Sequence, residues 1–346
     1  MKHLSIFLTL FFYLHLMSQA QSIVSSTDFA KWPITAIGKQ HQFCDGMIND
    51  LLQKADGFTY DSQNTMGTWF KNMKSNLSQS DIQWISSANC EPTAYMQNSR
   101  WEEKEVLLYP HTIPTTSDAN QTLVADCNTI SLLGEFAYLY PKFIQHIIKK
   151  ESNNSFAVSA FSPKGEQITI RVSNKILCDG KGTILQVKGK DGKANWSTIL
   201  EKAIMKYLQV FKGNSDITGF GAEQMTPIFT GDGRSFSIRP GVLRAHELKR
   251  MVTECLKHGL LVNGGFNKND IPLDKHVTIA AHGHTFMLSP SDNVLFLVRN
   301  PWGHGDDDHV MKVTDNGIIP QLIDLRIISP GIARLFFDPK ILVKGQ

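Results

Sequence analysis

The hydrophobic pattern of the chain changes its period near residue 154, and this change constrains the fold more than any other feature. In residues 126–149, apolar side chains recur every three or four positions, which predicts a helix with one buried face. These apolar residues are Ile130, Leu133, Phe136, Ala137, Tyr140, Phe143, Ile144 and Ile147. Residues 156–161 and 167–172 instead have the period of two that is typical of strands, and the turn at 162–165 predicts a β-hairpin.

The rest of the chain repeats this order, with helices followed by strands. Helical spacing returns at 196–211 and at 244–258, where Gly259 ends the second helix. We expect strands at 276–281, 285–289, 294–299 and 332–337. This order predicts an α+β protein with a helical lobe, a strand-rich lobe and a cleft between them.

The composition excludes two classes of protein. Of the 346 residues, 42% are hydrophobic and 19% are charged, which excludes a disordered chain. The formal net charge is +3, and no stretch carries a long run of one sign. A nucleic-acid partner is therefore not expected.

The first twenty residues have the pattern of a secretory signal peptide. Lys2 and His3 precede an apolar run at 4–17, and Ser18 and Ala20 place small residues before a cleavage site. A membrane anchor is the alternative, but the run of about fourteen residues is shorter than the roughly 20 that span a bilayer. We expect cleavage after Ala20, a secreted or periplasmic protein, and no membrane anchor in the mature chain.

Five cysteines are too few for a disulfide scaffold, and none forms a C-x-x-C pair that would indicate zinc. They are Cys44, Cys90, Cys127, Cys178 and Cys255. An odd number leaves at least one thiol free in an oxidising compartment, so one cysteine is a candidate nucleophile. Pairing of Cys44 with Cys90, and of Cys178 with Cys255, stays open.

Cys127 stands where a thiol can be activated. It follows the loop at 110–122 and opens the predicted helix, with Asp126 as the N-cap, and the helix dipole lowers the pKa of a thiol in that position. The alternative is a small core residue. His282 and His284 lie two residues apart on a predicted strand and share a face, and Asn300 begins the turn after the next strand. A thiol, an imidazole and an orienting amide are the groups that nucleophilic catalysis needs.

These residues stand in motifs that resemble a known family. The motifs are Gln121 with Asp126-Cys127, then Gly283-His284-Thr285-Phe286, then Arg299-Asn300-Pro301-Trp302-Gly303. In this order they resemble the catalytic core of calpain-family cysteine proteases. Residues 195–203 resemble the Trp-x-x-Leu-Leu-Glu-Lys-Ala helix of that family, and 228–231 resemble its Asp-Phe-Thr-Gly turn. The resemblance extends over roughly residues 100–340.

The resemblance implies a papain-like two-lobe fold, a cysteine endopeptidase and a protein or peptide substrate, and the signal-peptide pattern adds that the enzyme is exported. Cys127 would attack the peptide carbonyl, His284 would carry the proton and Asn300 would orient the imidazole. Gln121 would donate to the oxyanion, and Trp302 would shield the histidine–asparagine hydrogen bond. His282 is the alternative base, but the Gly-His-x-aromatic frame favours His284.

The implied domains follow from the same motifs. Residues 1–20 are the signal peptide, and 21–100 form an N-terminal region of open role, a propeptide or an accessory lobe. Residues 101–340 form the catalytic domain, with a cysteine lobe at 101–230 and a histidine–asparagine lobe at 231–340.

The chain also departs from the family pattern. Asn128 follows the cysteine where the family carries Trp, and Ser173-Asn174 replace an acidic pair. Asn128, together with the atypical residues 22–100, favours the alternative of an inactive domain that binds a peptide or protein partner. A third reading keeps the thiol chemistry but transfers the acyl group to an amine.

No cofactor is required by this reading, but calcium is expected in several calpain-like cores. The chain has no EF-hand loop, so a penta-EF-hand domain is excluded. Residues 306–308 with His304 and His309 form an acidic loop that can hold a metal, although such loops are more often solvated.

Sequons occur at Asn76, Asn120, Asn153 and Asn195, and a glycan on Asn120 would crowd Gln121.

Overall fold

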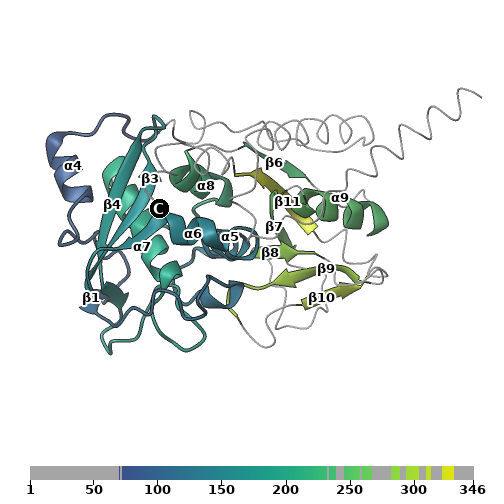
Figure 1. Cartoon of the computed structure of the whole chain (residues 1–346), viewed down its shortest axis with the longest axis horizontal. Helices are drawn as coiled ribbons and strands as arrows, with labels where there is room; N and C mark the ends of the chain where they lie inside the picture. The colour runs from purple at the N-terminus through teal and green to yellow at the C-terminus, as the bar shows by residue number, and fades with distance from the viewer. Residues whose placement is uncertain are drawn as a thin grey trace, which may run out of the picture.

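The computed structural model describes residue 70 and residues 72–231, 234–238, 245–257, 259–266, 282–288, 294–303, 309–312 and 322–330. Residues 1–69 lie outside this range, and with them the predicted signal peptide, Cys44 and most of the N-terminal region. The described residues form a mixed helix and sheet protein (Figure 1). None of the helices they form is both long and apolar enough to cross a membrane.

The helix predicted at 126–149 is two helices. Helix α5 (Cys127–Leu139) ends at Tyr140, and α6 (Pro141–Ile147) starts with a proline at its first position. Proline has no N–H to donate to the preceding turn, so it opens a new helix more readily than it continues an old one. The apolar positions that set the helical period are buried in both helices, so the prediction of the buried face is confirmed.

The predicted hairpin is confirmed. Strands β3 (Ser155–Phe161) and β4 (Gln167–Ser173) pair antiparallel, and β2 (Ile148–Lys150) adds a third strand on β3. Helix α7 (Trp196–Phe211) has the predicted bounds and packs on this sheet. Its N-cap is Asn195, whose side chain accepts from the Ser197 N–H. Helix α8 (Ala222–Thr230) follows and ends at Gly231, whose φ of 69° suits a glycine.

Residues 70–103 pack against the same part of the molecule. The segment contains α4 (Gln79–Ile85) and β1 (Arg100–Glu103), and β1 pairs with β5 (Lys175–Cys178). Two buried lysines of α7 hold it: Lys206 donates to the carbonyl of Ser87, and Lys202 forms an ion pair with Glu91 at 2.6 Å. Desolvation lowers the pKa of each lysine to about 8. A domain boundary at residue 101 therefore divides a packed unit.

The second part of the chain contains a six-stranded antiparallel sheet with the order β10-β9-β8-β7-β11-β6. Its strands are β6 (Arg234–Ile238), β7 (Leu261–Phe266), β8 (Gly283–Met287), β9 (Val294–Arg299), β10 (His309–Lys312) and β11 (Leu322–Ser329). The prediction at 294–299 matches β9, and the prediction at 285–289 overlaps β8, which begins and ends two residues earlier. The strands predicted at 276–281 and 332–337 lie outside the described residues.

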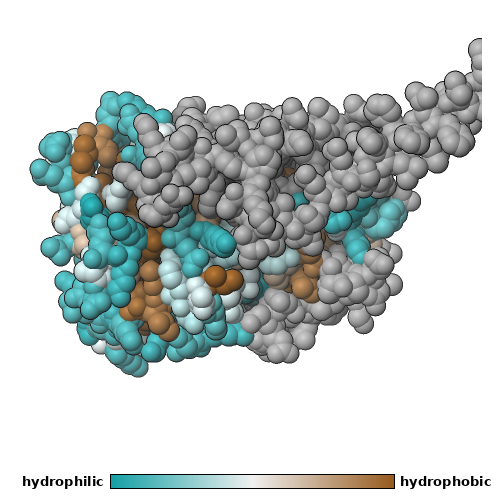
Figure 2. Space-filling model, in the orientation of Figure 1, coloured by the Kyte–Doolittle hydropathy of each residue, from teal (hydrophilic) through white to brown (hydrophobic). Residues whose placement is uncertain are grey.

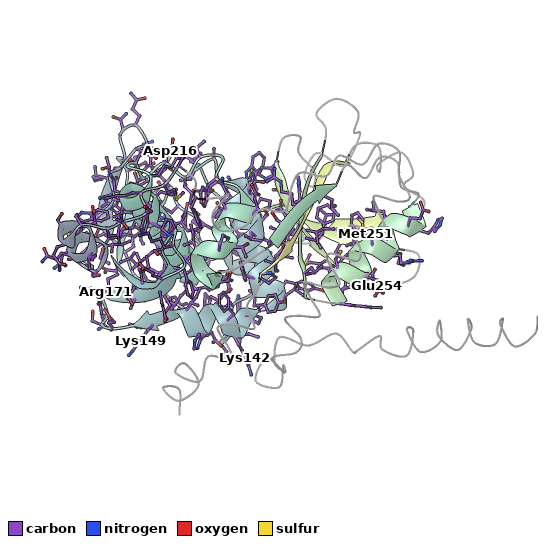
Figure 3. All side chains as sticks on the ribbon, turned by 90° about the horizontal axis from the view of Figure 1, so that it is seen from above. Lys142, Lys149, Arg171, Asp216, Met251 and Glu254 are labelled. Atoms are coloured by element: carbon purple, nitrogen blue, oxygen red, sulfur yellow. The ribbon has the colours of Figure 1, made fainter. Side chains whose placement is uncertain are left out.

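Helix α9 (Ala245–Lys257) confirms the prediction at 244–258, and its buried residues face the sheet near β7 and β9. Figure 3 shows Met251 and Glu254 of this helix at one end of the molecule, with Lys149 and Arg171 toward the other end. Hydrophilic residues predominate along the outer edge of the first part in Figure 2.

Helix α5 joins the two parts, because it packs on β7 and β8 as well as on α6, α7 and α8 (Figure 1). Gly134 makes this contact close: a Cβ there would lie 3.0 Å from Thr285 Oγ1. Thr285 Oγ1 donates to the Ser131 carbonyl at 2.7 Å, and Asn263 Nδ2 donates to Ser131 Oγ. The start of α5 is therefore held directly against the start of β8.

Candidate active site

Cys127 is the first residue of α5, as the sequence predicted, and its side chain is half-buried. The sulfur is surrounded by backbone N–H groups of Cys127, Asn128 and Gly283, which stabilise a thiolate. Burial outweighs them and raises the pKa of the thiol above its ordinary value. The expectation of a lowered pKa is therefore wrong for this structure, and the thiol is neutral at physiological pH.

Gly283 allows β8 to approach the first turn of α5. A Cβ at this position would lie 2.6 Å from Asn128 Oδ1 and 3.1 Å from Ser131 Oγ. A larger residue would push the strand away from the helix. Asn128, the residue that departs from the family pattern, thus lines this contact between helix and strand.

His282 lies just before β8 and pairs with Asn300. The distance between His282 Nε2 and Asn300 Oδ1 is 2.9 Å, and both residues are buried. The Trp302 N–H donates to the same Asn300 Oδ1 at 2.9 Å, which identifies that atom as the amide oxygen. Nε2 of His282 must then carry the proton, so Nδ1 is the basic nitrogen. Desolvation lowers the pKa of His282 to about 4, although the bond to Asn300 acts in the opposite direction.

Trp302 covers this pair. Its ring lies 4.8 Å from the His282 ring, centroid to centroid, and it is one of the few large apolar side chains that are exposed in the described part of the chain. The predicted position of Trp302 beside the histidine–asparagine hydrogen bond agrees with this contact, with His282 in place of His284.

His284 has a different environment. Its side chain is fully buried in the middle of the sheet, and its Nδ1 lies 2.9 Å from the carbonyl oxygen of His282. The two histidine rings meet edge to face with centroids 5.2 Å apart, so they share a face as predicted. The hydrogen bond to Asn300 that we expected of His284 is formed by His282, two residues earlier in the chain.

Gln121 is engaged within its own loop. Its side-chain nitrogen donates to the Val124 carbonyl at 2.7 Å and lies 3.4 Å from Asp126 Oδ1. Its backbone N–H donates to the Pro301 carbonyl at 2.7 Å. The predicted loop position is thus observed beside the 299–303 turn, but in this conformation the amide hydrogens of Gln121 face the loop.

Two buried carboxyl groups lie beneath the nucleophile. Asp126 is the N-cap of α5 but makes no capping hydrogen bond with its side chain. Its carboxyl group is instead hydrogen-bonded to that of Glu201 on α7. Burial raises the pKa of both groups, and that of Glu201 lies well above its ordinary value. Such a pair shares a proton, because two adjacent carboxylates cannot both be charged without a cation.

The described residues contain no group of three or more His, Cys, Asp or Glu side chains that would hold a metal. Glu201 Oε2 accepts hydrogen bonds from the Val187 N–H at 2.9 Å and from Gln186 Nε2 at 3.1 Å. The acidic loop at 304–308 lies outside the described residues.

Other predicted features have a clear place. The described cysteines, Cys90, Cys127, Cys178 and Cys255, are not joined by disulfides, so the Cys178–Cys255 pairing is not formed. Asn120 and Asn195 are buried, which excludes a glycan on the folded protein at these sequons. Asn76 and Asn153 are exposed.

The chain matches the family model described as calpain family cysteine protease over residues 70–308, more than half of its 346 residues. It therefore belongs to the calpain family of cysteine proteases. The matched range begins at residue 70 and includes the segment that packs on α7. No curated protein sequence matches the chain.

Proposed function

We propose that this protein is a cysteine endopeptidase of papain-like two-lobe architecture, with Cys127 as nucleophile, His282 as general base and Asn300 as the residue that orients the imidazole. One observation carries the proposal. The His282–Asn300 hydrogen bond, covered by Trp302, leaves Nδ1 of His282 basic, and the next residue, Gly283, directs its N–H toward the Cys127 sulfur.

The neutral thiol and the neutral imidazole define the order of proton transfers. His282 takes the thiol proton while the sulfur attacks the peptide carbonyl carbon and forms the new S–C bond. His282 then gives this proton to the leaving amine as the C–N bond breaks. Water attacks the acyl-enzyme, His282 takes the proton of that water, and the released thiolate recovers it. The backbone N–H of Cys127, at the helix start, would serve as the first oxyanion donor.

Gln121 is the second oxyanion donor in this proposal. Its amide must turn away from Val124 to serve this role, and it then breaks the hydrogen bond to the Val124 carbonyl and the longer one to Asp126 Oδ1, each worth about 1 kcal/mol. If Gln121 keeps its hydrogen bond to the Val124 carbonyl when a peptide is bound, the alternative of an inactive peptide-binding domain is favoured. Transfer of the acyl group to an amine uses the same first step and differs only in the final acceptor.

Calcium, where it binds, would be held by Asp126 and Glu201. The ion would supply positive charge that neutralises both carboxylates beside the nucleophile. The expected result is a higher melting temperature in millimolar calcium than in chelator at pH 8, absent in Glu201→Gln. An equal rise in wild type and variant would place the ion elsewhere.

We further propose that residues 1–20 direct export and are removed. Sequencing of the N-terminus of the protein recovered from its native source is expected to begin at Gln21. An N-terminus at Met1 would contradict export by this signal.

The direct test of the function is covalent labelling followed by turnover. The chain from Gln21 onward is treated with an epoxide that alkylates papain-like thiols, and intact mass is measured for wild type and Cys127→Ala. One adduct on wild type, none on the variant, and Cys127-dependent cleavage of casein are expected. A folded wild type with reduced Cys127, no adduct and no cleavage would overturn the proposal and favour the binding domain. An added amine appearing on the products would identify the transferase.

A further inference from the structure

Asn120 precedes the predicted oxyanion residue Gln121, and the only motif it belongs to in the sequence is a sequon. The side chain is 8% exposed and all of its polar atoms are engaged. Its nitrogen donates to the carbonyls of Ser117 at 2.7 Å and Lys188 at 3.2 Å. Its oxygen accepts from the Arg299 guanidinium at 2.8 Å. Asn120 thus connects its own loop to the end of β9.

The loop and the turn meet at more than this one bond. Arg299 also donates to the Ala119 carbonyl at 3.1 Å, and the Gln121 N–H donates to the Pro301 carbonyl at 2.7 Å. A Cβ at Gly303, where φ is 63°, would lie 1.8 Å from Asn120 Oδ1, so the turn closes directly on the Asn120 amide. Residues 119–121 therefore contact the turn on both sides of Asn300.

Asn300 lies between the two anchored residues, Arg299 and Pro301, and its own side chain holds His282. The loop at 119–121 leads into Cys127 six residues later. The position of the imidazole relative to the thiol is thus fixed through Asn120. We propose that Asn120 is a positioning residue for the reaction: it holds the 299–303 turn, and with it the His282–Asn300 pair, in register with the Cys127 loop. This inference rests on the proposed function.

The chemistry of the contact explains why an asparagine serves here. Arg299 is fully buried, and Asn120 Oδ1 and the Ala119 carbonyl supply neutral acceptors for one of its terminal nitrogens. An aspartate would pair with the guanidinium, but its second oxygen would face the carbonyls of Ser117 and Lys188 without a proton to donate. Alanine removes both the donor to the Ser117 and Lys188 carbonyls and the acceptor for Arg299. Serine keeps a polar group, but its side chain is too short to reach these partners.

The test uses a readout that does not depend on proteolysis. The imidazole of His282 is titrated by NMR in the wild-type chain and in Asn120→Ala, with Asn120→Ser as the second variant. Asn174→Ala is the matched control, because Asn174 also bonds a backbone carbonyl, that of Lys104, but does not touch the turn. The rate of Cys127 alkylation by iodoacetamide, and kcat and KM for casein peptides, are measured over the same pH range.

In wild type the titration is expected near pH 4. In Asn120→Ala it should rise by about one unit, because a loosened turn admits water to His282. The variant kcat should fall about tenfold with little change in KM, since misplacement of a catalytic group costs rate rather than binding. Asn120→Ser should lie between the two, and Asn174→Ala should equal wild type.

An unchanged His282 titration in folded Asn120→Ala or Asn120→Ser, with loss of melting temperature only, would overturn the inference. If Asn120→Ala does not fold, the serine variant decides by the same criterion. A wild type without turnover, but with the titration shift in the variants, would support the positioning role of Asn120 and contradict the proposed protease activity. The two failures are therefore distinguishable.

Discussion

The indole of Trp302 packs on the imidazole of His282 with ring centroids 4.8 Å apart, over the bond between His282 and Asn300. The bond is thereby removed from competing water, and burial of the imidazole accounts for its low pKa. The contact also keeps Nδ1 unprotonated across the physiological range. A neutral imidazole can take the thiol proton, but its low pKa makes it a weak base for a thiol of raised pKa, so the proton moves only as the sulfur attacks.

Replacement of Trp302 with Ala is expected to expose the His282–Asn300 bond and to lower kcat about tenfold, the range of one impaired acid–base group. The acid limb of the pH–rate profile should move upward, toward the ordinary histidine pKa of about 6.5. Trp302→Phe retains an aromatic cover and should keep most of the rate. Steady-state kinetics between pH 4 and 9 measures both effects, and an unchanged acid limb in Trp302→Ala would contradict the shielding role.

Gly283→Ala is expected to separate β8 from the start of α5. The added Cβ would meet Asn128 Oδ1 at 2.6 Å, so either the strand or the Asn128 side chain must shift. The N–H of Gly283 would then leave the Cys127 sulfur, and alkylation of Cys127 by iodoacetamide at pH 8 should slow by about threefold to tenfold.

The double variant Gly283→Ala/Asn128→Ala is the matched control, since it removes the nearest atom that the new methyl group meets. It should recover part of the alkylation rate. Equal rates in wild type and Gly283→Ala would show that the thiol does not depend on this contact.

Glu135 predicts how stability depends on pH. It lies on α5, is fully buried, and has as polar neighbours the Val262 backbone and the Asn263 side chain of β7, whose hydrogen bonds only partly offset the burial. Burial raises its folded-state pKa well above the ordinary value, so the folded state favours the protonated form. Its contribution to stability is complete below the unfolded pKa near 4 and is lost as pH rises through the folded value.

The free energy of unfolding, and with it the melting temperature, should therefore fall as pH rises from the unfolded pKa toward the folded one, by at most about 1.4 kcal/mol per pH unit for each such group. Glu135→Gln keeps the shape without the charge and should flatten this slope. The Asp126–Glu201 pair contributes in the same direction, so some slope should remain. Thermal melts of both proteins from pH 5 to 9 provide the comparison, and parallel slopes would contradict a raised pKa at Glu135.

The hydrophobic period alone was sufficient to predict the bounds of helices and strands that have an uninterrupted apolar pattern. Helix α7 and strand β9 have the predicted bounds because their apolar positions face a single core. Strand β7 was not predicted because its sequence contains two consecutive glycines, and β11 because Asp324 and Arg326 interrupt its apolar run. The break between α5 and α6 could have been predicted from Pro141 alone.

The candidate site shows a different limit. His282 and His284 are two residues apart and share a face, so strand periodicity cannot distinguish them. What distinguishes them is that His282 forms the hydrogen bond with Asn300, and the two residues of this bond are 18 positions apart in the chain. The pairing of Glu201 with Asp126 could not be predicted for a similar reason. The sequence shows the motif that contains Glu201, but only the folded structure brings its carboxyl group to Asp126. Asn120 gave no chemical signal, because its partner Arg299 lies 179 positions away.

The most direct test of the proposed mechanism is to determine which histidine is the general base. His282→Gln and His284→Gln are matched in size and charge, and each is compared with wild type and Cys127→Ala for cleavage of casein at pH 7.5. We predict that His282→Gln lowers kcat/KM by at least about a hundredfold, close to Cys127→Ala, while folded His284→Gln retains cleavage and loses mainly melting temperature. Full activity in His282→Gln together with its loss in folded His284→Gln would contradict the assignment of His282 as the base.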